Sequence, residues 1–284
     1  MYALVAFVQV RSPAQYKCCF VEVKQIKGEP ERFLPCFVFR RNMKKTVALV
    51  DVRMPAEGAE ALSEYGYKVI RVPGADYLAP PVCSHPDMIF LSLGEKLFCH
   101  RRYFLSPGGR NTAENIISCT GKTLAVTDDE TGAEYPLDVG LNAAVIGDVF
   151  ISSPHTSREV LSTAVELGMN VLRVKQGYVK CSAAVIDGER KGIITSDSGI
   201  ARAAKNVGIA VLTVPAGNIL LPGYDYGFIG GCTGYDDGRL FFSGDLSLYR
   251  YGKEAEVFLH SLGCTPVSLL PGRPLTDYGS ILFL

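Results

Sequence analysis

The sequence predicts an α/β fold of five pseudo-repeated helix-strand-hairpin units that close into a propeller. Three observations predict it: a recurring phrase, a hairpin pattern after most copies of the phrase, and an incomplete last unit. The phrase is a helical stretch with apolar residues at three-to-four spacing, then a glycine, a short link and an apolar strand. Its five copies cover residues 59–72, 113–126, 160–174, 200–214 and 255–270.

Each element of the phrase has a local physical reason. The apolar spacing gives a helix with one buried face. Glycine ends the helix because it adopts the left-handed conformation without the steric cost that other residues incur. The β-branched run that follows is typical of a buried strand. The terminating glycines are Gly66, Gly121, Gly168, Gly208 and Gly263.

A hairpin is predicted after the strand in most units. Asp-Gly between two apolar runs is a strong hairpin signal, and it occurs at Asp187-Gly188 and at Asp237-Gly238. The predicted strand pairs are 181–186 with 192–195, 226–230 with 239–242, 87–91 with 96–98, and 142–146 with 149–151.

The fifth hairpin is incomplete, because the chain ends with one apolar strand, 277–284. A matching strand, 46–52, precedes the first helix. Pairing the two would close a ring of five units and remove the exposed sheet edges, as propellers do. An open α/β sandwich with coincidental spacing is the alternative.

The repeat also divides the chain. Residues 43–284 are predicted to form the single five-unit propeller, a length suited to one large domain. Residues 1–42 lie outside it, as an N-terminal extension with its own hairpin around residues 27–30. Our hypothesis is that Met43 is the natural start and that the extension comes from a mis-annotated start.

Composition excludes several function classes. The 284 residues hold 29 Lys and Arg and 29 Asp and Glu, so the formal net charge is zero, which argues against a general nucleic-acid partner. The apolar runs are too short to predict a membrane span. The nine cysteines are an odd number without any C-x-x-C pair, which favours free thiols in a reducing cytoplasm over a disulfide framework.

Familiar cofactor motifs fail. Gly121-Lys122-Thr123 resembles the end of a phosphate-binding loop, but Ile116 stands where that motif requires glycine. The four histidines do not cluster with cysteines, which argues against structural zinc. The sequence therefore predicts no metal and no cofactor.

Polar residues collect where the hairpins begin. In a ring of such units these equivalent positions would face one central cavity. They are His85 and Asp87 in the first unit, Lys180 and Cys181 in the third, Asp225 in the fourth and Asp277 in the fifth. Each of these residues also has a purely structural interpretation. Cys181 could pack in the core, His85 could form a turn, and Asp225 and Asp277 could accept hydrogen bonds from backbone N–H groups.

The motifs resemble those of the pentein superfamily, whose members modify guanidino groups. His85-Pro86-Asp87 resembles the family's H-x-D before an apolar strand, and Cys181 lies two units later, as the family's nucleophile does. Asp277 lies one unit before the histidine round the ring, where the family has an acidic residue. The chain departs from the family at its C-terminal strand, where the family has its cysteine and this sequence reads Asp277-Tyr-Gly-Ser280. The resemblance covers residues 43–284 as an uncharacterised branch.

The resemblance implies a hydrolase that acts on a small guanidino or amidino compound through a cysteine thiolate. Cys181 would attack the guanidinium carbon and His85 would protonate the leaving amine and then activate water. Asp87 and Asp277 would bind the guanidinium, and Asp225 and Lys180 would also contact the substrate. Lys180 or the cationic substrate would lower the pKa of the neighbouring thiol. Cys232 is a weaker alternative nucleophile.

Two other functions stay open on the sequence alone. One is an amidinotransferase with the same thiol chemistry, and the other is a non-catalytic pentein-like binding or assembly module. The outer helices of a propeller would offer a surface on which copies of the chain could pair.

Overall fold

Five small mixed sheets make up the part of the chain that the computed structural model describes, residues 45–284. Each sheet has three strands, and its middle strand runs antiparallel to one neighbour and parallel to the other. The first three sheets are β15 (Leu282–Phe283), β1 (Val47–Asp51) and β2 (Lys68–Val72); β3 (Phe90–Leu93), β4 (Lys96–His100) and β5 (Thr123–Thr127); and β6 (Ala144–Ile146), β7 (Val149–Ser152) and β8 (Asn170–Arg173). The other two are β9 (Ala183–Asp187), β10 (Lys191–Thr195) and β11 (Ala210–Thr213), and β12 (Thr233–Asp236), β13 (Arg239–Phe242) and β14 (Thr265–Ser268).

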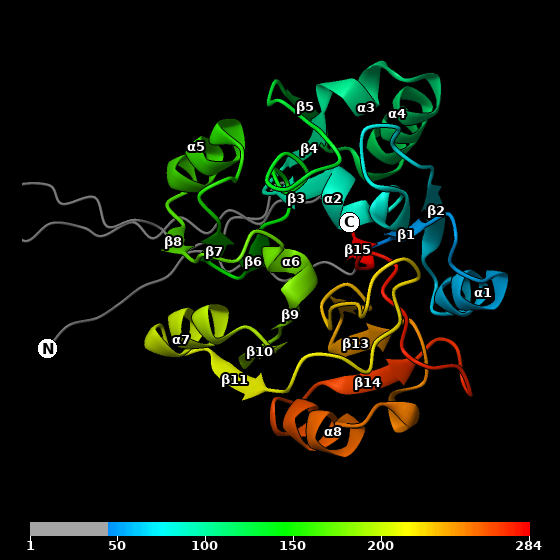
Figure 1. Ribbon diagram of the computed structural model, residues 1–284, viewed down its shortest axis with the longest axis vertical. Coiled ribbons are helices and arrows are strands. Elements are labelled where there is room, and N and C mark those ends of the chain that lie inside the picture. Colours follow the sequence, from blue (N-terminus) through cyan, green and yellow to red (C-terminus); the bar gives the residue numbers. More distant parts are fainter. Residues whose placement is uncertain (1–44) are drawn as a thin grey trace, which may run out of the picture. The chain divides into compact units, whose positions relative to one another are not determined.

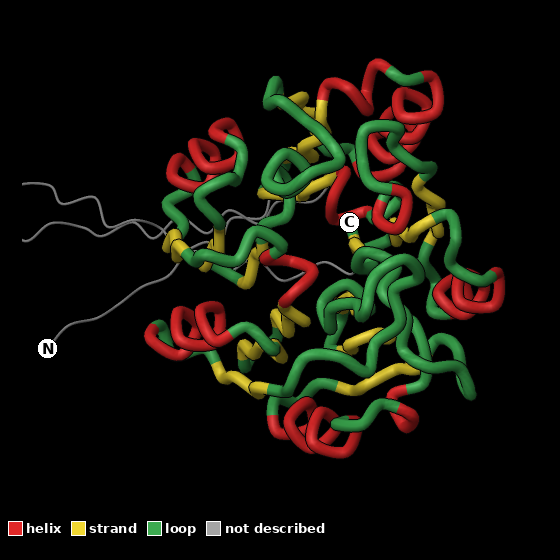
Figure 2. The backbone as a smooth tube through the Cα atoms, in the orientation of Figure 1, coloured by secondary structure: helices red, strands yellow, loops and turns green. Residues whose placement is uncertain are grey.

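A helix connects the middle strand of each sheet to its parallel neighbour, as a parallel crossover requires. The five connecting helices are α1 (Ala56–Glu64), α4 (Pro107–Thr120), α5 (Arg158–Glu166), α7 (Ser198–Asn206) and α8 (Gly252–Ser261). The short α3 (Arg101–Leu105) precedes α4. The predicted glycines end these five helices, all with positive φ between 67° and 91°. In Figure 1 the five sheets follow one another round a centre, with these helices outside (Figures 1 and 2).

The last strand pairs with the first. β15 lies antiparallel to β1, with Ala48 opposite Phe283 and Leu49 opposite Leu282. The Leu284 carbonyl also accepts hydrogen bonds from the backbone N–H groups of Thr46 and Val47. The predicted pairing of the C-terminal strand with the strand that precedes the first helix is therefore confirmed.

One predicted strand is wrong. Residues 226–230 form a loop, and the hairpin through Asp237-Gly238 instead uses β12, which begins at Thr233. The loop is held by a long-range contact, because the Phe228 N–H donates to the Asp277 carboxylate at 2.8 Å. Four other predicted strands begin at least two residues later than expected. In two of them one-turn helices occupy the first residues: α2 (Pro86–Ile89) and α6 (Val179–Ser182). The strands predicted from residues 142 and 277 begin at Ala144 and Leu282.

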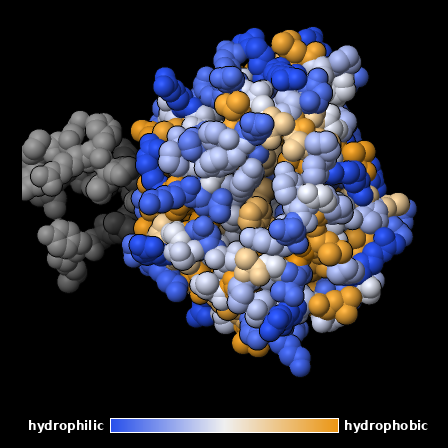
Figure 3. Space-filling model, in the orientation of Figure 1, coloured by the Kyte–Doolittle hydropathy of each residue, from blue (hydrophilic) through white to orange (hydrophobic). Residues whose placement is uncertain are grey.

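Apolar side chains fill the space between each sheet and its helices. The largest fully buried ones include Phe90, Phe98, Phe150 and Phe241, all on strands. On the face shown in Figure 3, hydrophobic residues are interspersed with hydrophilic ones. Within residues 45–284 no helix combines the length and apolarity that crossing a membrane requires.

The described residues belong to one compact unit, 44–284. The predicted extension 1–42, its hairpin around residues 27–30 and the hypothesis that Met43 is the start lie outside the described residues. The division at residue 43 stays a prediction.

Candidate functional site

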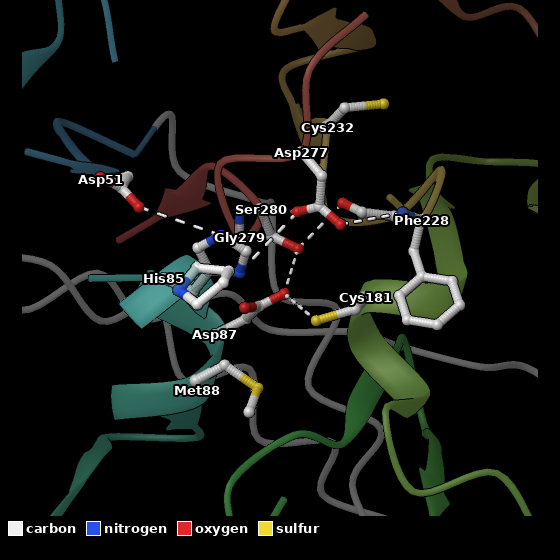
Figure 4. A network of polar contacts seen from close by, with 12 residues as sticks. Asp51, His85, Asp87, Met88, Cys181, Phe228, Cys232, Asp277, Gly279 and Ser280 are labelled. Carbon is white, nitrogen blue, oxygen red and sulfur yellow. Dashed lines mark hydrogen bonds and ion pairs between the residues drawn. The ribbon is translucent and has the colours of Figure 1, made fainter. Parts of the chain in front are cut away.

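Two one-turn helices present the central polar residues. α2 carries Asp87 and α6 carries Lys180 and Cys181, and each helix leads directly into the first strand of its sheet. Pro86 begins α2, where its missing N–H costs nothing. Because both helices end after four residues, their side chains stay at the entrance of the strands, and Asp87 and Cys181 point toward one another (Figure 4).

Asp87 and Cys181 are in direct contact. The Cys181 Sγ–H donates to Asp87 Oδ2 at 3.1 Å, and the Ser280 hydroxyl lies 2.6 Å from the same carboxylate oxygen. Lys180 Nζ in turn donates to Ser280 Oγ at 3.0 Å. A thiol, a carboxylate, a hydroxyl and an ammonium from segments that lead into three different sheets thus form one network.

His85 and Asp277 lie next to this network and close to each other. His85 Nδ1 is 3.8 Å from Asp277 Oδ1, and Nε2 is 4.0 Å from Asp51 Oδ2. Neither ring nitrogen makes a hydrogen bond to another described residue. Asp277 is fixed by backbone N–H groups of Phe228 and Gly279, at 2.8 and 2.9 Å. The imidazole is therefore placed between two carboxylates with its nitrogens available.

Asp51 is a site residue that the sequence analysis missed. It ends β1, is fully buried and accepts hydrogen bonds from Ser84 Oγ at 2.8 Å and from the Arg53 guanidinium. An aspartate at the end of an otherwise apolar strand was the available signal. This carboxylate is already paired with arginine, so it is better suited to orient His85 than to bind a second cation.

Asn142 and Ser280 were also missed. Each stands two residues before the first strand of its hairpin or sheet, as Cys181 does: Asn142 before β6 and Ser280 before β15. Asn142 Nδ2 donates to Cys181 Sγ at 3.0 Å, and its Oδ1 accepts from the N–H groups of Lys180 and Cys181. Comparing this one position across the five repeats was the signal that could have found both.

Hydrogen bonds at these positions link neighbouring sheets in turn. Asn142 contacts the Asp87 carbonyl and Cys181, and the Gly231 N–H donates to the Cys181 carbonyl. The Ser280 N–H donates to the Gly231 carbonyl, and the Asp87 N–H donates to the Gly279 carbonyl. The chain of contacts therefore passes through all five sheets and returns to its origin.

The site is closed in this structure. His85, Asp87, Cys181, Asp277 and Ser280 are each 1–3% exposed. The partly buried Tyr178 and Phe228 pack against the apolar cluster that contains Cys181, and their rings stack at 6.1 Å between centroids. The central polar side chains are therefore shielded from solvent.

Burial and charge set the ionisation of the site. Burial, and then the nearby Asp87 and Asp277 carboxylates, raise the pKa of the Cys181 thiol well above its usual range. Burial also raises the pKa of Asp277 and lowers that of Lys180. These shifts favour the neutral thiol in the closed state, and positive charge added beside the sulfur would favour the thiolate.

The structure brings together five of the six predicted site residues: His85, Asp87, Lys180, Cys181 and Asp277. Asp225 is exposed, in the loop that replaces the predicted strand, and takes no part in the network. Cys232 is fully buried nearby, and its Sγ–H donates to the Ile229 carbonyl at 3.2 Å. Among the described residues, no group of three or more His, Cys, Asp or Glu is placed to hold a metal ion.

Comparison with known proteins identifies the fold. A model described as "Family of unknown function (DUF6873)" matches residues 49–282. No curated protein sequence matches the chain. The structure is similar to an amidinotransferase of the saxitoxin biosynthetic pathway from Microseira wollei, with 13% identity, TM-score 0.50 and coverage of 83% of this chain and 90% of the other.

Two further solved structures are similar. The inosamine-phosphate amidinotransferase of Streptomyces griseus has 12% identity and TM-score 0.50, with coverage of 84% and 93%. DDAH from Pseudomonas aeruginosa, complexed with citrulline, has 12% identity and TM-score 0.47, with coverage of 80% and 93%. The chain therefore has the pentein fold, and the predicted resemblance is confirmed at the level of fold.

Proposed function

The chain belongs to the DUF6873 family, and we propose that it is a hydrolase of a small guanidino or amidino compound that works through a Cys181 thiolate. The observation that carries the proposal is the 3.1 Å contact between Cys181 Sγ and Asp87 Oδ2, with His85 and Asp277 in the same buried network. The proposal takes the five sheets as one closed propeller whose centre holds the site. The β1–β15 pairing and the circuit of hydrogen bonds between sheets support that closure.

The residue types suit a guanidinium, which is planar, cationic and weakly electrophilic. Asp87 and Asp277 supply carboxylate oxygens for its N–H groups. Both carboxyl groups are buried, so the charge of a bound guanidinium would offset the cost of burying their negative charges. The same cation would lower the pKa of Cys181, because it opposes the two carboxylates that raise it. The thiol would thus ionise when substrate binds.

The reaction follows in two steps. The Sγ proton passes to Asp87, the thiolate forms a bond to the guanidinium carbon, and the C–N bond breaks as His85 protonates the leaving amine. His85 then takes a proton from water, and the resulting hydroxide attacks the same carbon. The C–S bond breaks, and the released urea-type product passes its extra proton to the freed amine. The proton on Asp87 returns to the sulfur, so the enzyme is regenerated.

Access needs a change of shape. Substrate would enter as the Tyr178 and Phe228 rings move away from Cys181, a gating step common in enzymes with closed sites. Asp225 lies exposed in the loop next to Tyr226 and stays a predicted contact for the outer part of the substrate. The burial of His85, Asp87, Cys181 and Asp277 favours a small reacting group.

The experiment is turnover of a panel of guanidino and amidino compounds, followed by release of ammonia or amine. Cys181→Ser is expected to abolish turnover, with a loss of about a thousandfold or more, because the nucleophile is removed. Cys232→Ser is the matched control, since it changes a second buried cysteine that lies outside the network. Equal turnover by Cys181→Ser and wild type would overturn the proposal.

The closed network also favours a second candidate, a non-catalytic binding or assembly module. Ser280 and Cys181 donate to Asp87 Oδ2, and Lys180 donates to Ser280, so the polar groups can be read as a structural core. Full cellular function of Cys181→Ser would support that reading. An amidinotransferase would share the first step and differ only in that an added amine, in place of water, accepts the amidino group.

A further inference from the structure

Asn142 contacts the Cys181 segment through both ends of its side chain, the sulfur at one end and backbone N–H groups at the other. Its Nδ2 lies 3.0 Å from Cys181 Sγ, and its Oδ1 lies 2.8 and 3.2 Å from the backbone nitrogens of Lys180 and Cys181. The side chain is fully buried, so no water replaces these contacts. The loop before β6 thus reaches across to the one-turn helix that carries the proposed nucleophile.

The orientation of the amide is fixed by its partners. Two backbone N–H donors face Oδ1, and a flipped amide would set its own N–H groups against them. Nδ2 therefore points to acceptors: Cys181 Sγ, the Asp87 carbonyl at 3.2 Å and Met88 Sδ at 3.3 Å. An amide donor is compatible with a thiol and favours a thiolate, because the charged acceptor makes the stronger hydrogen bond.

The electrostatic setting makes this donor important. Asp87 and Asp277 both oppose ionisation of Cys181, whereas the hydrogen bond from Asn142 favours it. Lys180 Nζ is committed to Ser280 Oγ, not to the sulfur. Among the described residues, Asn142 is the side chain that donates a hydrogen bond to Sγ.

We propose that Asn142 is a further catalytic residue, whose Nδ2–H stabilises the Cys181 thiolate while its Oδ1 anchors the helix that carries it. The inference rests on the proposed function, because it assigns Asn142 to the thiolate step of that reaction. Nδ2 acts on the sulfur and Oδ1 acts on the helix backbone, so the two roles can be tested separately.

Asn142→Asp separates them by design. The substitution keeps an oxygen for the N–H groups of Lys180 and Cys181 and replaces the Sγ donor by a second oxygen. We expect the thiolate fraction of Cys181 at a fixed pH to fall about tenfold or more, because a hydrogen bond to the thiolate is lost and a carboxylate is added beside it. Asn115→Asp is the matched control, since Asn115 contacts Cys119 on the exposed helix α4 and not Cys181.

The readout is the rate at which iodoacetamide alkylates Cys181, followed by peptide mass against pH. A second readout, the ultraviolet thiolate absorbance of each protein minus that of its Cys181→Ser counterpart, needs no reagent to reach the buried sulfur. Asn142→Ala, which removes the donor without adding a charge or a hydroxyl, repeats the measurement if Asn142→Asp does not fold. An unchanged pH profile in the folded variant overturns the inference.

The two proposals fail in different ways. If Cys181→Ser abolishes turnover but Asn142→Asp leaves the alkylation profile unchanged, the hydrolase stands and the role of Asn142 falls. If Cys181→Ser turns over normally, the proposed function falls, whatever the alkylation profile of Asn142→Asp.

Discussion

Cys181 Sγ lies 3.1 Å from Asp87 Oδ2, so the thiol donates a hydrogen bond to a carboxylate that belongs to a different repeat unit. The contact has two opposing consequences. It places a base beside the sulfur, and its negative charge raises the pKa of the same thiol. Reactivity of the free protein and reactivity with a cationic substrate therefore depend on Asp87 in opposite directions.

The first prediction follows from this opposition. In Asp87→Asn the carboxylate charge is removed, so the pKa of Cys181 should fall and its alkylation at neutral pH should accelerate. Turnover of a guanidino substrate should fall at least tenfold, because one charge that binds the guanidinium is lost. Peptide mass spectrometry measures the first effect and amine release the second. Parallel losses of both would contradict the assigned role of Asp87.

The second prediction concerns Ser280, which links Lys180 to Asp87 from a backbone position with φ of 53°. Ser280→Ala should lower the free energy of unfolding by about 1–3 kcal/mol, because it removes the partner of two buried charged groups. Ser280→Gly loses the same hydroxyl but adopts positive φ freely, so it should be about 1 kcal/mol more stable than Ser280→Ala. Urea unfolding of both variants measures the difference, and the reverse order would argue against strain at this residue.

The repeat could be predicted because each unit contains local sequence signals for the end of its helix or for the turn of its hairpin. Gly66 and Gly121 end helices in the conformation that the sequence indicates, and Asp187-Gly188 makes its turn between paired strands. The site was predicted less completely. Asn142 and Cys181 are 39 residues apart, and Ser280 and Asp87 are 193 residues apart, so no local pattern reports their contact.

The predicted strand 226–230 failed for the same reason. Its apolar, aromatic composition favours a strand, but its backbone is held by a side chain from the end of the chain, Asp277. The Cβ position of Gly231 would lie 2.1 Å from the Asp277 carboxylate, which shows how closely that side chain packs on the loop. A long-range hydrogen bond thus overrides local propensity where the site is built.

The third prediction compares two glycines with similar backbone angles. Gly279 has φ of 72°, and a Cβ there would lie 2.1 Å from the His85 Cβ. Gly121 has φ of 67° and open space around its Cβ position. Gly121→Ala should cost about 1–2 kcal/mol of unfolding free energy from backbone strain alone, whereas Gly279→Ala should cost more and displace His85. Thermal unfolding ranks the two, and equal losses would mean that the close approach to His85 is not maintained in solution.

The fourth prediction is a dependence of stability on pH that arises at His100. This residue is 1% exposed; its Nδ1 lies 3.1 Å from Thr127 Oγ1, and burial lowers its pKa from 6.5 to about 4. Between these two pH values the unfolded chain binds a proton that the folded chain does not, so stability should decrease as the pH falls from 6.5 toward 4. The contribution is at most about 3 kcal/mol, from 1.36 kcal/mol per pKa unit.

His100→Gln isolates this contribution because glutamine does not titrate. The variant should lose less unfolding free energy than wild type between pH 6.5 and 4, even if it is less stable at neutral pH. The comparison is needed because burial raises the pKa values of Asp138 and Asp277. These two carboxyl groups therefore increase stability as the pH falls, whereas His100 decreases it. Chemical denaturation of both proteins at several pH values gives the difference, and parallel curves would mean that His100 is accessible to protons in the folded state.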